Sequence, residues 1–185
     1  MTTIPVLPET DRIRDSREKW LHDGRNRPEF ADQTPEGTQS VWDFPRPPAI
    51  EQVKAVLRVF NAKTLIAETQ AGVRVIETAG APTYYFPPAD VEPELITFGE
   101  MTSICEWKGV AQSLTVDGIT EAGWRYVRMF EAYTNLYQWC SFYPQKLLCF
   151  VDTELVTHQP GGFYGGWVTA DLRGPLKGTP GTETW

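Results

Sequence analysis

Cysteine and histidine are scarce in this sequence. Its 185 residues include three cysteines and two histidines, and no two cysteines form a Cys-x-x-Cys pair. Cys105, Cys140, Cys149 and His158 can be counted as a metal-binding set, but structural zinc sites draw their ligands from close pairs. An odd number of cysteines without framework spacing indicates reduced thiols. We therefore expect no disulfide and no metal site.

Long apolar runs are also missing. No stretch approaches about 18 consecutive apolar residues, and the first residues lack the apolar core of a signal peptide. Together with the reduced thiols, this predicts a cytoplasmic protein that does not enter a membrane. The net charge of −7 and the pI near 4.9 repel phosphate backbones. No extended nucleic-acid groove is expected, although a local basic pocket is compatible with the composition.

Nucleotide-binding fingerprints are absent too. Residues 161–166 read GGFYGG, which lacks the G-x-G-x-x-G spacing, and residues 174–178 are not a P-loop. Backbone amides in these stretches would suit an anion, but such glycines more often serve tight turns. No internal repeat is found.

Aromatic residues, glycine and proline are plentiful. Aromatic residues make up 12% of the chain, and there are 15 glycines and 15 prolines. This mixture favours β structure with many loops. A chain of this length buries about 70% of its unfolded surface, so its core needs no disulfide or metal. One domain with extensions is expected.

Short strand-like segments follow one another from residue 52 onward. The predicted strands cover residues 53–60, 65–69, 73–78, 83–86, 103–107, 110–116, 147–151 and 155–158. Residues 90–95 are expected to form at most one helical turn. Residues 123–139 have aromatic side chains at helical spacing, which indicates a short helix or an irregular segment. Strands this short and frequent predict an all-β, mainly antiparallel fold.

The first residues form a polar segment. Residues 1–39 are interpreted as an N-terminal arm. In this arm Thr10 or Asp11 could cap a single helix that runs to about Leu21 and stops at Gly24. The alternative is a loosely docked or disordered arm.

The remainder, residues 40–185, is predicted to form the domain. Residues 40–48 should lie extended against it, because their prolines bar regular structure. The tail from Gln159 is rich in glycine and proline but also contains aromatic residues, which disordered ends usually lack. We therefore expect the tail to wrap around the domain and pack.

The densest chemistry lies in residues 102–109, TSICEWKG. A thiol, a carboxylate, an indole and an ammonium occupy Cys105, Glu106, Trp107 and Lys108. A strand through this segment would send Cys105 and Trp107 to one face and Glu106 and Lys108 to the other.

Cys105 is a candidate nucleophile. A catalytic thiol needs a base within reach, and only His22 and His158 are available. The simpler interpretation is a small, buried, apolar residue.

Three cations are candidates for anion binding, namely Arg74, Lys108 and Lys177. Each lies beside aromatic or glycine-rich sequence. A positive charge inside an acidic protein is what a ligand with a phosphate or carboxylate would need. The alternative is ordinary surface charge and, for Arg74, an ion pair at a strand edge.

Carboxylates and aromatic residues complete the candidate chemistry. The candidate acid–base or Mg²⁺-binding groups are Glu77, Asp90 and Glu106, against the alternative of surface carboxylates. Aromatic residues that could stack on a planar ligand are Tyr84, Tyr85, Trp107, Trp124 and Tyr126. Alternation places Tyr84 and Tyr85 on opposite faces, so only one of them can line a given pocket.

The order of several motifs resembles one protein family. The motifs are SVWDFPRPP, the run RVIETAGAPTYYFPPADV from Arg74 to Val91, TSICEWKG, Trp124 with Tyr126, SFYPQK, PGGFYGGW and GPLKGTPGT. In this order they resemble the bacterial and archaeal family called DUF427, whose domain has also been labelled nucleotidyltransferase-like. The resemblance runs from about residue 40 to residue 185 and leaves residues 1–39 outside.

The resemblance implies a β-tent, in which two antiparallel sheets meet at roughly a right angle, with short helical segments. Other β-tent families hold zinc through two Cys-x-x-Cys knuckles, which this chain lacks, so the resemblance implies no metal. It also implies no established reaction or cofactor. Fold analogy to related β-tent families indicates small-molecule binding between the sheets.

The sequence departs from the family pattern at three places. Residues 79–82 read Ala-Gly-Ala-Pro where the family commonly has Ser-His-Pro-Pro. Ser113 and Leu114 replace a frequent aromatic pair, and Val127 replaces a usual proline. A mechanism that needs the missing histidine is therefore in doubt for this chain.

Our leading hypothesis is a pocket between the sheets that binds a small anionic or nucleotide-like ligand. The residues expected to bind this ligand are Arg74, Glu77, Tyr85, Cys105, Trp107, Lys108, Trp124 and Tyr126. One alternative is a metal-dependent enzyme acting on nucleotide-like substrates, with Glu77 or Glu106 holding a metal–phosphate group. The other is a protein-interaction module that uses exposed strand edges, and a homodimer is left open. No catalytic residue and no cofactor are assigned.

Overall fold

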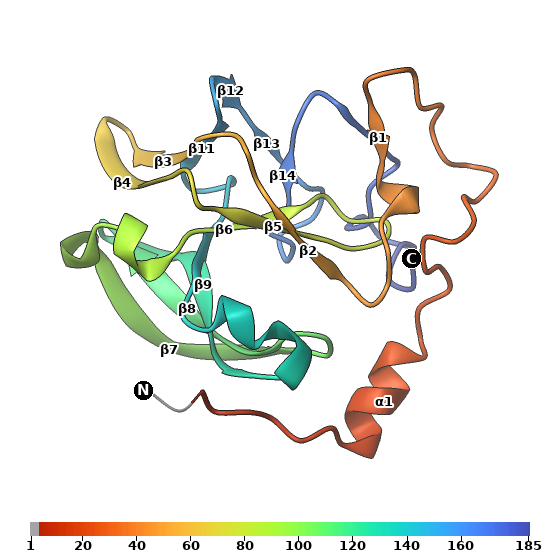
Figure 1. The fold of residues 1–185 in the computed structure, drawn as a ribbon, viewed down its shortest axis with the longest axis horizontal. Coiled ribbons are helices and arrows are strands. Elements are labelled where there is room, and N and C mark those ends of the chain that lie inside the picture. The colour runs from red at the N-terminus through yellow and green to blue at the C-terminus, as the bar shows by residue number, and fades with distance from the viewer. Residues whose placement is uncertain (1–3) are drawn as a thin grey trace.

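The computed structural model describes residues 4–185 and is built mainly of antiparallel strands (Figure 1). Its helices are α1 (Asp11–Arg17) and four 3-10 helices, η1 (Val41–Asp43), η2 (Pro88–Asp90), η3 (Pro93–Leu95) and η4 (Glu131–Leu136). Its strands are β1 (Gln39–Ser40), β2 (Ala49–Gln52), β3 (Leu57–Asn61), β4 (Thr64–Thr69), β5 (Val73–Ile76), β6 (Thr83–Tyr85), β7 (Ile96–Cys105), β8 (Gly109–Val116), β9 (Ile119–Met129), β10 (Cys140–Phe142), β11 (Leu148–Val151), β12 (Glu154–Leu155), β13 (Thr157–His158), β14 (Trp167–Val168) and β15 (Leu172–Arg173). The predicted all-β class with short helical segments is confirmed. No helix of residues 4–185 is long and apolar enough to cross a membrane.

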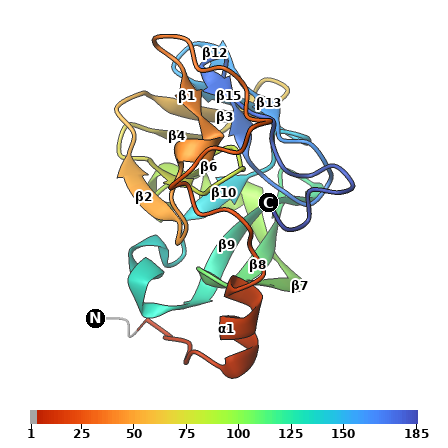
Figure 2. The ribbon, with the colours of Figure 1, turned by 90° about the vertical axis from the view of Figure 1, so that its right-hand side faces the viewer.

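Most strands belong to two layers. One is the sheet β12-β11-β3-β4. The other combines the sheets β2-β5-β6 and β10-β9-β8-β7, because Phe86, directly after β6, exchanges both backbone hydrogen bonds with Cys140 of β10 (2.8 and 3.0 Å). This pairing continues the hydrogen-bond ladder from β6 into β10, so the two sheets together form one bent layer (Figures 1 and 2).

The main hydrophobic core lies between these layers. Leu57 of β3, Ile66 of β4, Leu114 of β8 and Trp167 of β14 are fully buried in it. Tyr84 belongs to this core and stacks on Trp167 with ring centroids 4.9 Å apart. The next residue, Tyr85, belongs to a second cluster on the opposite face, as strand alternation predicted.

β-Bulges interrupt the pairing of β7, β8 and β9. In β7 the register shifts between Phe98 and Thr102, so that three residues lie opposite Ser113 alone. Another shift between Val110 and Ala111 in β8 leaves Val127 of β9 as the extra residue. Bulges bend strands and redirect side chains. These bulges flank the cavities described below.

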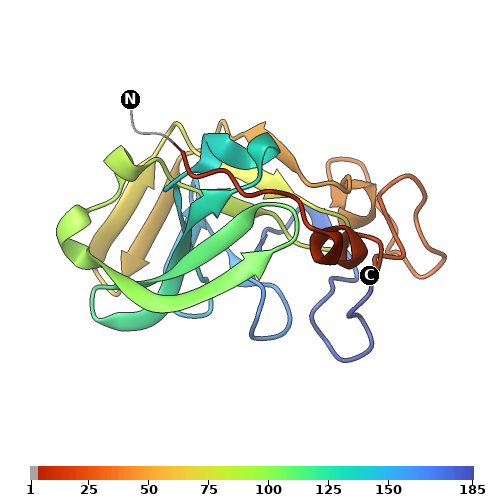
Figure 3. The same ribbon diagram turned by 90° about the horizontal axis from the view of Figure 1, so that it is seen from below.

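Both ends of the chain pack against the layers. The N-terminal segment crosses one face of the molecule and leads into α1 (Figure 3), whose N-cap is Thr10. It is held by a backbone bridge between Val6 and Met129. At the other end β15 pairs in parallel with β1, and Trp185 stacks on Phe30 at 4.9 Å.

Three predicted elements differ from the structure. Helix α1 ends at Arg17 rather than near Leu21. Residues 53–56 are not strand, because the backbone N–H of Val56 donates to the side chain of Asp152 (2.8 Å) instead of continuing a ladder. The segment 40–48, expected to be extended, contains the helical turn η1.

The largest correction concerns residues 123–139. Residues 123–129 belong to β9, because Trp124 and Tyr126 alternate at period two and are buried on one face. The helical spacing of the aromatic residues is realised only in η4, which buries Tyr133 and Leu136.

Gly109 provides a test of this architecture. It has a φ of 127°, and a methyl group there would lie 2.2 Å from the carbonyl oxygen of Arg128. We expect Gly109→Ala to lower the free energy of unfolding by about 3 kcal/mol, measured by urea denaturation. Gly118→Ala is the control, because Gly118 also has positive φ (79°) but nothing within 4 Å of a Cβ, and it should cost about 1 kcal/mol. Equal losses of unfolding free energy in the two variants would show that contact with Arg128 adds nothing to the cost at Gly109.

Candidate functional site

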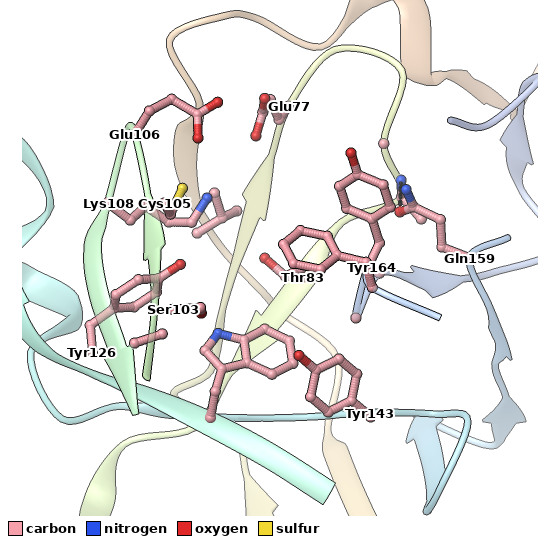
Figure 4. Close-up of a pocket in the computed structure, with 18 of the residues that line it drawn as sticks. Glu77, Thr83, Ser103, Cys105, Glu106, Lys108, Tyr126, Tyr143, Gln159 and Tyr164 are labelled. Carbon is pink, nitrogen blue, oxygen red and sulfur yellow. Dashed lines mark hydrogen bonds between the residues drawn. The ribbon is translucent and has the colours of Figure 1, made fainter. Parts of the chain in front are cut away.

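A cavity of about 250 Å³, here called the inner cavity, lies on the opposite side of the bent layer from the main core. Its walls come from the β5–β6 and β7–β8 connections, from β9 and from the tail. Figure 4 shows Cys105, Lys108 and Tyr126 reaching into it from one side, while Thr83, Gln159 and Tyr164 lie across from them. Six of the eight predicted ligand residues line it, namely Glu77, Tyr85, Cys105, Lys108, Trp124 and Tyr126.

Lys108 contributes an unpaired positive charge. It closes the turn between β7 and β8, and only 8% of its surface is exposed. Its ammonium has neither a hydrogen bond nor an ion pair with any other residue in the range 4–185. Desolvation lowers the pKa of Lys108, but Cys105, Tyr85 and Glu77 raise that pKa by more, so it lies above its ordinary value. The group is therefore an ammonium at neutral pH.

Two tyrosine hydroxyls accompany this charge. Tyr85 is fully buried, and its hydroxyl has no hydrogen-bond partner within residues 4–185. Burial, with Tyr85 and Cys105 nearby, raises the pKa of Tyr126 well above its usual range. Tyr126 is therefore a protonated donor at neutral pH. An unsatisfied buried polar group costs about 1–3 kcal/mol, and it calls for an explanation in a folded protein.

Glu77 is the centre of an ion cluster. It follows β5 and lies 3.1 Å from Arg46 Nε and 3.5 Å from Lys177 Nζ. The side chains of Arg46, Lys177 and Glu77 are only 3%, 5% and 18% exposed. Burial raises the pKa of Glu77, but Lys177, Lys108 and Arg46 lower it further, so the net shift is downward. Glu77 is thus ionised and in direct contact with Arg46 and Lys177, whereas Lys108 interacts with it only at longer range.

Aromatic rings form the rest of the wall. The rings of Trp124 and Tyr143 lie 4.6 Å apart, and Tyr85 meets Trp124 edge-on at 6.2 Å. The loop between β13 and β14 lies directly on the indole, because a Cβ at Gly165 would come within 2.3 Å of Trp124. A glycine is needed there for the loop to form this wall.

The N-terminal arm covers the cavity. Trp20 lines it and donates its indole N–H to Glu106 Oε1 (2.8 Å). The same ring lies 4.4 Å from the Lys177 ammonium and 4.3 Å from the Arg46 guanidinium, both within cation–π range. Arg17 in α1 reinforces the contact by donating to the carbonyl of Glu106 (2.8 Å).

Arg74 does not reach the inner cavity. Its guanidinium pairs with Glu51 (2.8 Å) across the β2–β5 ladder and donates to Gln39 (3.0 Å). The ion pair at a strand edge, considered as the alternative, is what the structure contains. Arg74, which was predicted to bind the ligand, therefore lies apart from the six predicted residues that line the inner cavity.

Trp107 also lies elsewhere. β7 ends at Cys105, and residues 106–108 turn, so strand alternation does not extend to Trp107. Its ring packs beneath the Arg17 guanidinium at 4.9 Å and lines a separate cavity under the arm.

The cavity also contains residues that the sequence analysis does not predict to bind the ligand. Lys177 is predicted only as a candidate for anion binding, and the residues without any prediction are Trp20, Tyr143, Gln159 and Tyr164. Buried Gln159 accepts from Ala81 N (2.9 Å) and donates to Lys177 O (3.0 Å), which ties the tail to the β5–β6 connection. Only the unusual aromatic content of the tail hinted at such packing.

Gly80 stands where the resemblance led us to expect histidine. It lines the inner cavity, and a Cβ there would lie 3.6 Å from Lys177 Cε and 3.8 Å from Gln159 Oε1. A histidine side chain would therefore start at the edge of the cavity. In this chain glycine occupies that position, and no imidazole of residues 4–185 lines the cavity.

The alternative metal-binding sets are not assembled in the described part of the chain. No three His, Cys, Asp or Glu side chains of residues 4–185 lie close enough to hold a metal ion. Cys140 and Cys149 lie in the main core, where burial raises the pKa of Cys140 to about 11 and that of Cys149 even further. Asp90 accepts from the Thr69 hydroxyl (2.5 Å) and does not line the inner cavity.

Comparison with known families identifies the domain. The model of a family described as a domain of unknown function (DUF427) matches residues 35–157, more than half of the chain, so the protein belongs to this family. The resemblance seen in the motifs is thereby confirmed. No curated protein matches the sequence. The cavity residues that fall outside the matched range are Trp20, Gln159, Phe163, Tyr164, Gly165, Gly166 and Lys177.

Glu77→Gln tests the ion cluster. Removing this carboxylate leaves Arg46 and Lys177 buried without their partner, and we expect a loss of about 3 kcal/mol in the free energy of unfolding. Glu51→Gln is the matched control, because the Glu51–Arg74 pair is more exposed and should contribute at most about 1 kcal/mol. Similar losses in both variants would contradict a special role for Glu77.

The same cluster has a pH signature. The pKa of Glu77 is lower in the folded protein, so its stabilisation is present above the unfolded pKa of about 4.3. This stabilisation is lost as the pH falls through the folded pKa. Glu77→Gln should accordingly show a shallower loss of stability in acid than the wild type.

Alkylation of Cys105 tests the cover provided by the arm. Cys105 is partly exposed, while Cys140 and Cys149 are buried, so iodoacetamide should label Cys105 first in the native protein. Trp20→Ala removes a wall of the inner cavity and should accelerate this labelling several-fold, as followed by mass spectrometry. Leu21→Ala changes an exposed neighbour and should leave the rate unchanged. Equal rates in all three proteins would show that Trp20 does not cover the thiol.

Proposed function

We propose that this DUF427 protein binds a small, planar, anionic or nucleotide-like ligand in the inner cavity. The observation that carries the proposal is Lys108, a largely buried residue whose ammonium reaches into the inner cavity and has no hydrogen-bond or ion-pair partner within residues 4–185. Buried charges are normally paired. An anion in the cavity would supply the missing partner.

The hydroxyls beside Lys108 support an anionic ligand further. Tyr126 is a protonated donor, and the Tyr85 hydroxyl has no hydrogen-bond partner in the described chain. A carboxylate or phosphate oxygen can accept from an ammonium and from hydroxyls at once, whereas a cation cannot. Each such charge-assisted hydrogen bond contributes about 1.5–3 kcal/mol.

The aromatic wall supports a planar ligand. Trp124 and Tyr143 lie together on one side of the cavity, and Tyr126 is near its cationic end. Aromatic faces stack on planar rings with little dependence on ring identity. A cavity of about 250 Å³ accommodates one ring with an anionic substituent.

The carboxylates favour binding over metal-dependent catalysis. Glu77 is held by Arg46 and Lys177, and Glu106 accepts from the Trp20 indole. A carboxylate that already neutralises two cations is a poor ligand for Mg²⁺. The hypothesis of an enzyme acting on nucleotide-like substrates therefore has less support than the hypothesis of a binding protein.

Lys108→Met tests the proposal with 4-hydroxybenzoate as a planar anionic probe. The variant keeps the length of the side chain but removes its charge, and we expect affinity to fall at least tenfold because one charge-assisted bond is lost. The measurement is an NMR titration, with circular dichroism to check the fold. Lys63→Met removes an exposed lysine that lies outside the inner cavity, and affinity should be unchanged. Undiminished binding to Lys108→Met, or no binding by the wild type at 20 mM probe, would refute the site.

A further inference from the structure

A second cavity of about 430 Å³ adjoins the first. It lies along β7, β8 and β9, and is here called the outer groove. The residues that line both cavities are Ser103, Ala111, Trp124, Tyr143 and Phe163. Because the Trp124–Tyr143 pair belongs to both walls, a molecule stacked on it in the inner cavity borders the outer groove as well.

The β7 bulge accompanies this groove. Three residues of β7 oppose Ser113 alone, so β7 departs from regular pairing between Phe98 and Thr102. Met101, Thr102 and Ser113, at or beside this irregularity, line the groove. Phe163, 74% exposed in the tail loop, lies at the junction of the two cavities.

The lining of the outer groove differs in chemistry from that of the inner cavity. Ser103 and Ser113 present their hydroxyls on the sheet face that carries Ala111 and Trp124, because Ser103 pairs with Ala111 and Ser113 pairs with Trp124. The ionisable groups are Glu121 and Lys146, one of each sign. Lys146 is already engaged with the carbonyl of Thr120 (2.8 Å). The groove therefore presents hydroxyls without an excess of charge.

We propose that the outer groove is the second half of one binding site, and that the natural ligand has two parts. Its planar anionic head occupies the inner cavity on Lys108. An uncharged, hydroxyl-bearing arm, of the chemistry of a sugar, leaves past Trp124 and Phe163 and lies along Ser103 and Ser113. This inference rests on the proposed function, because the head must bind before the arm can be positioned.

The experiment uses two matched probes. 4-Hydroxybenzoate represents the head alone, and 4-carboxyphenyl β-D-glucopyranoside carries the same carboxylate with a sugar on the opposite end of the ring. We expect the glucoside to bind the wild type at least tenfold more tightly than hydroxybenzoate, as measured by NMR titration of the full chain. Lys108→Met should weaken both probes.

Two variants locate the sugar. Ser113→Phe fills the outer groove from a position that does not line the inner cavity, and it should abolish the gain from the sugar, while hydroxybenzoate affinity stays within twofold. Thr97→Phe is the control, because Thr97 is exposed on the neighbouring strand β7 and lines neither cavity, so the gain should persist.

The outcomes separate the two proposals. Equal affinities for the two probes in the wild type, or a gain that survives Ser113→Phe, would overturn the two-part ligand while leaving the anion site standing. If neither probe binds the wild type at 20 mM, the proposed function fails and the inference fails with it. If only the glucoside binds and Lys108→Met does not weaken it, the groove binds sugars independently, and the two-part site is likewise refuted.

Discussion

The buried ion pair between Arg46 and Glu77 is the interaction on which the site depends. Arg46 also donates to the carbonyls of His22, Thr78 and Trp185 (2.5, 3.0 and 3.1 Å), so one guanidinium joins the arm, the end of the β5 strand and the tail. A desolvated guanidinium is tolerable only when its donors are satisfied. These three segments must therefore come together at once, and the inner cavity is formed where they meet. Breaking the pair would therefore weaken the attachment of the arm and of the tail to the cavity together.

This arrangement explains why the family match describes only part of the site. The matched residues 35–157 supply Glu77, Lys108 and Trp124. The arm adds Trp20 and the tail adds Lys177, whose ammonium lies against the Trp20 ring. Segments outside the match therefore complete the walls of the inner cavity, and the desolvated Arg46 guanidinium holds them through short-range contacts. A ligand of the proposed kind would meet walls that are already assembled, which lowers the entropy that binding must overcome.

The sequence predicted features that depend on local periodicity, and it failed where contacts between distant segments decide. Tyr84 and Tyr85 lie on opposite faces of β6, as predicted, because strand alternation is a property of the backbone. Trp107 did not follow that rule, since the turn before Gly109 ends the strand. Arg74 was assigned to the ligand because nothing local revealed that Glu51 lies across the ladder from it. The sequence likewise gives no sign that the Gln159 side chain hydrogen-bonds to both Ala81 and Lys177, because these residues are far from it along the chain.

The proposed anion site lies inside an acidic protein, and this would have a consequence for selectivity. The net charge of −7 repels anions at long range, but at physiological ionic strength this repulsion is screened beyond about 8 Å. A small anion that enters the inner cavity meets Lys108 at close range, with low-dielectric aromatic walls that strengthen the attraction. A large polyanion would keep most of its charge outside, against the acidic surface, and gain from one ammonium only. Burial of Lys108 at the base of a cavity therefore selects small anions over polymers, and a neutral groove beside it can add specificity without adding repulsion.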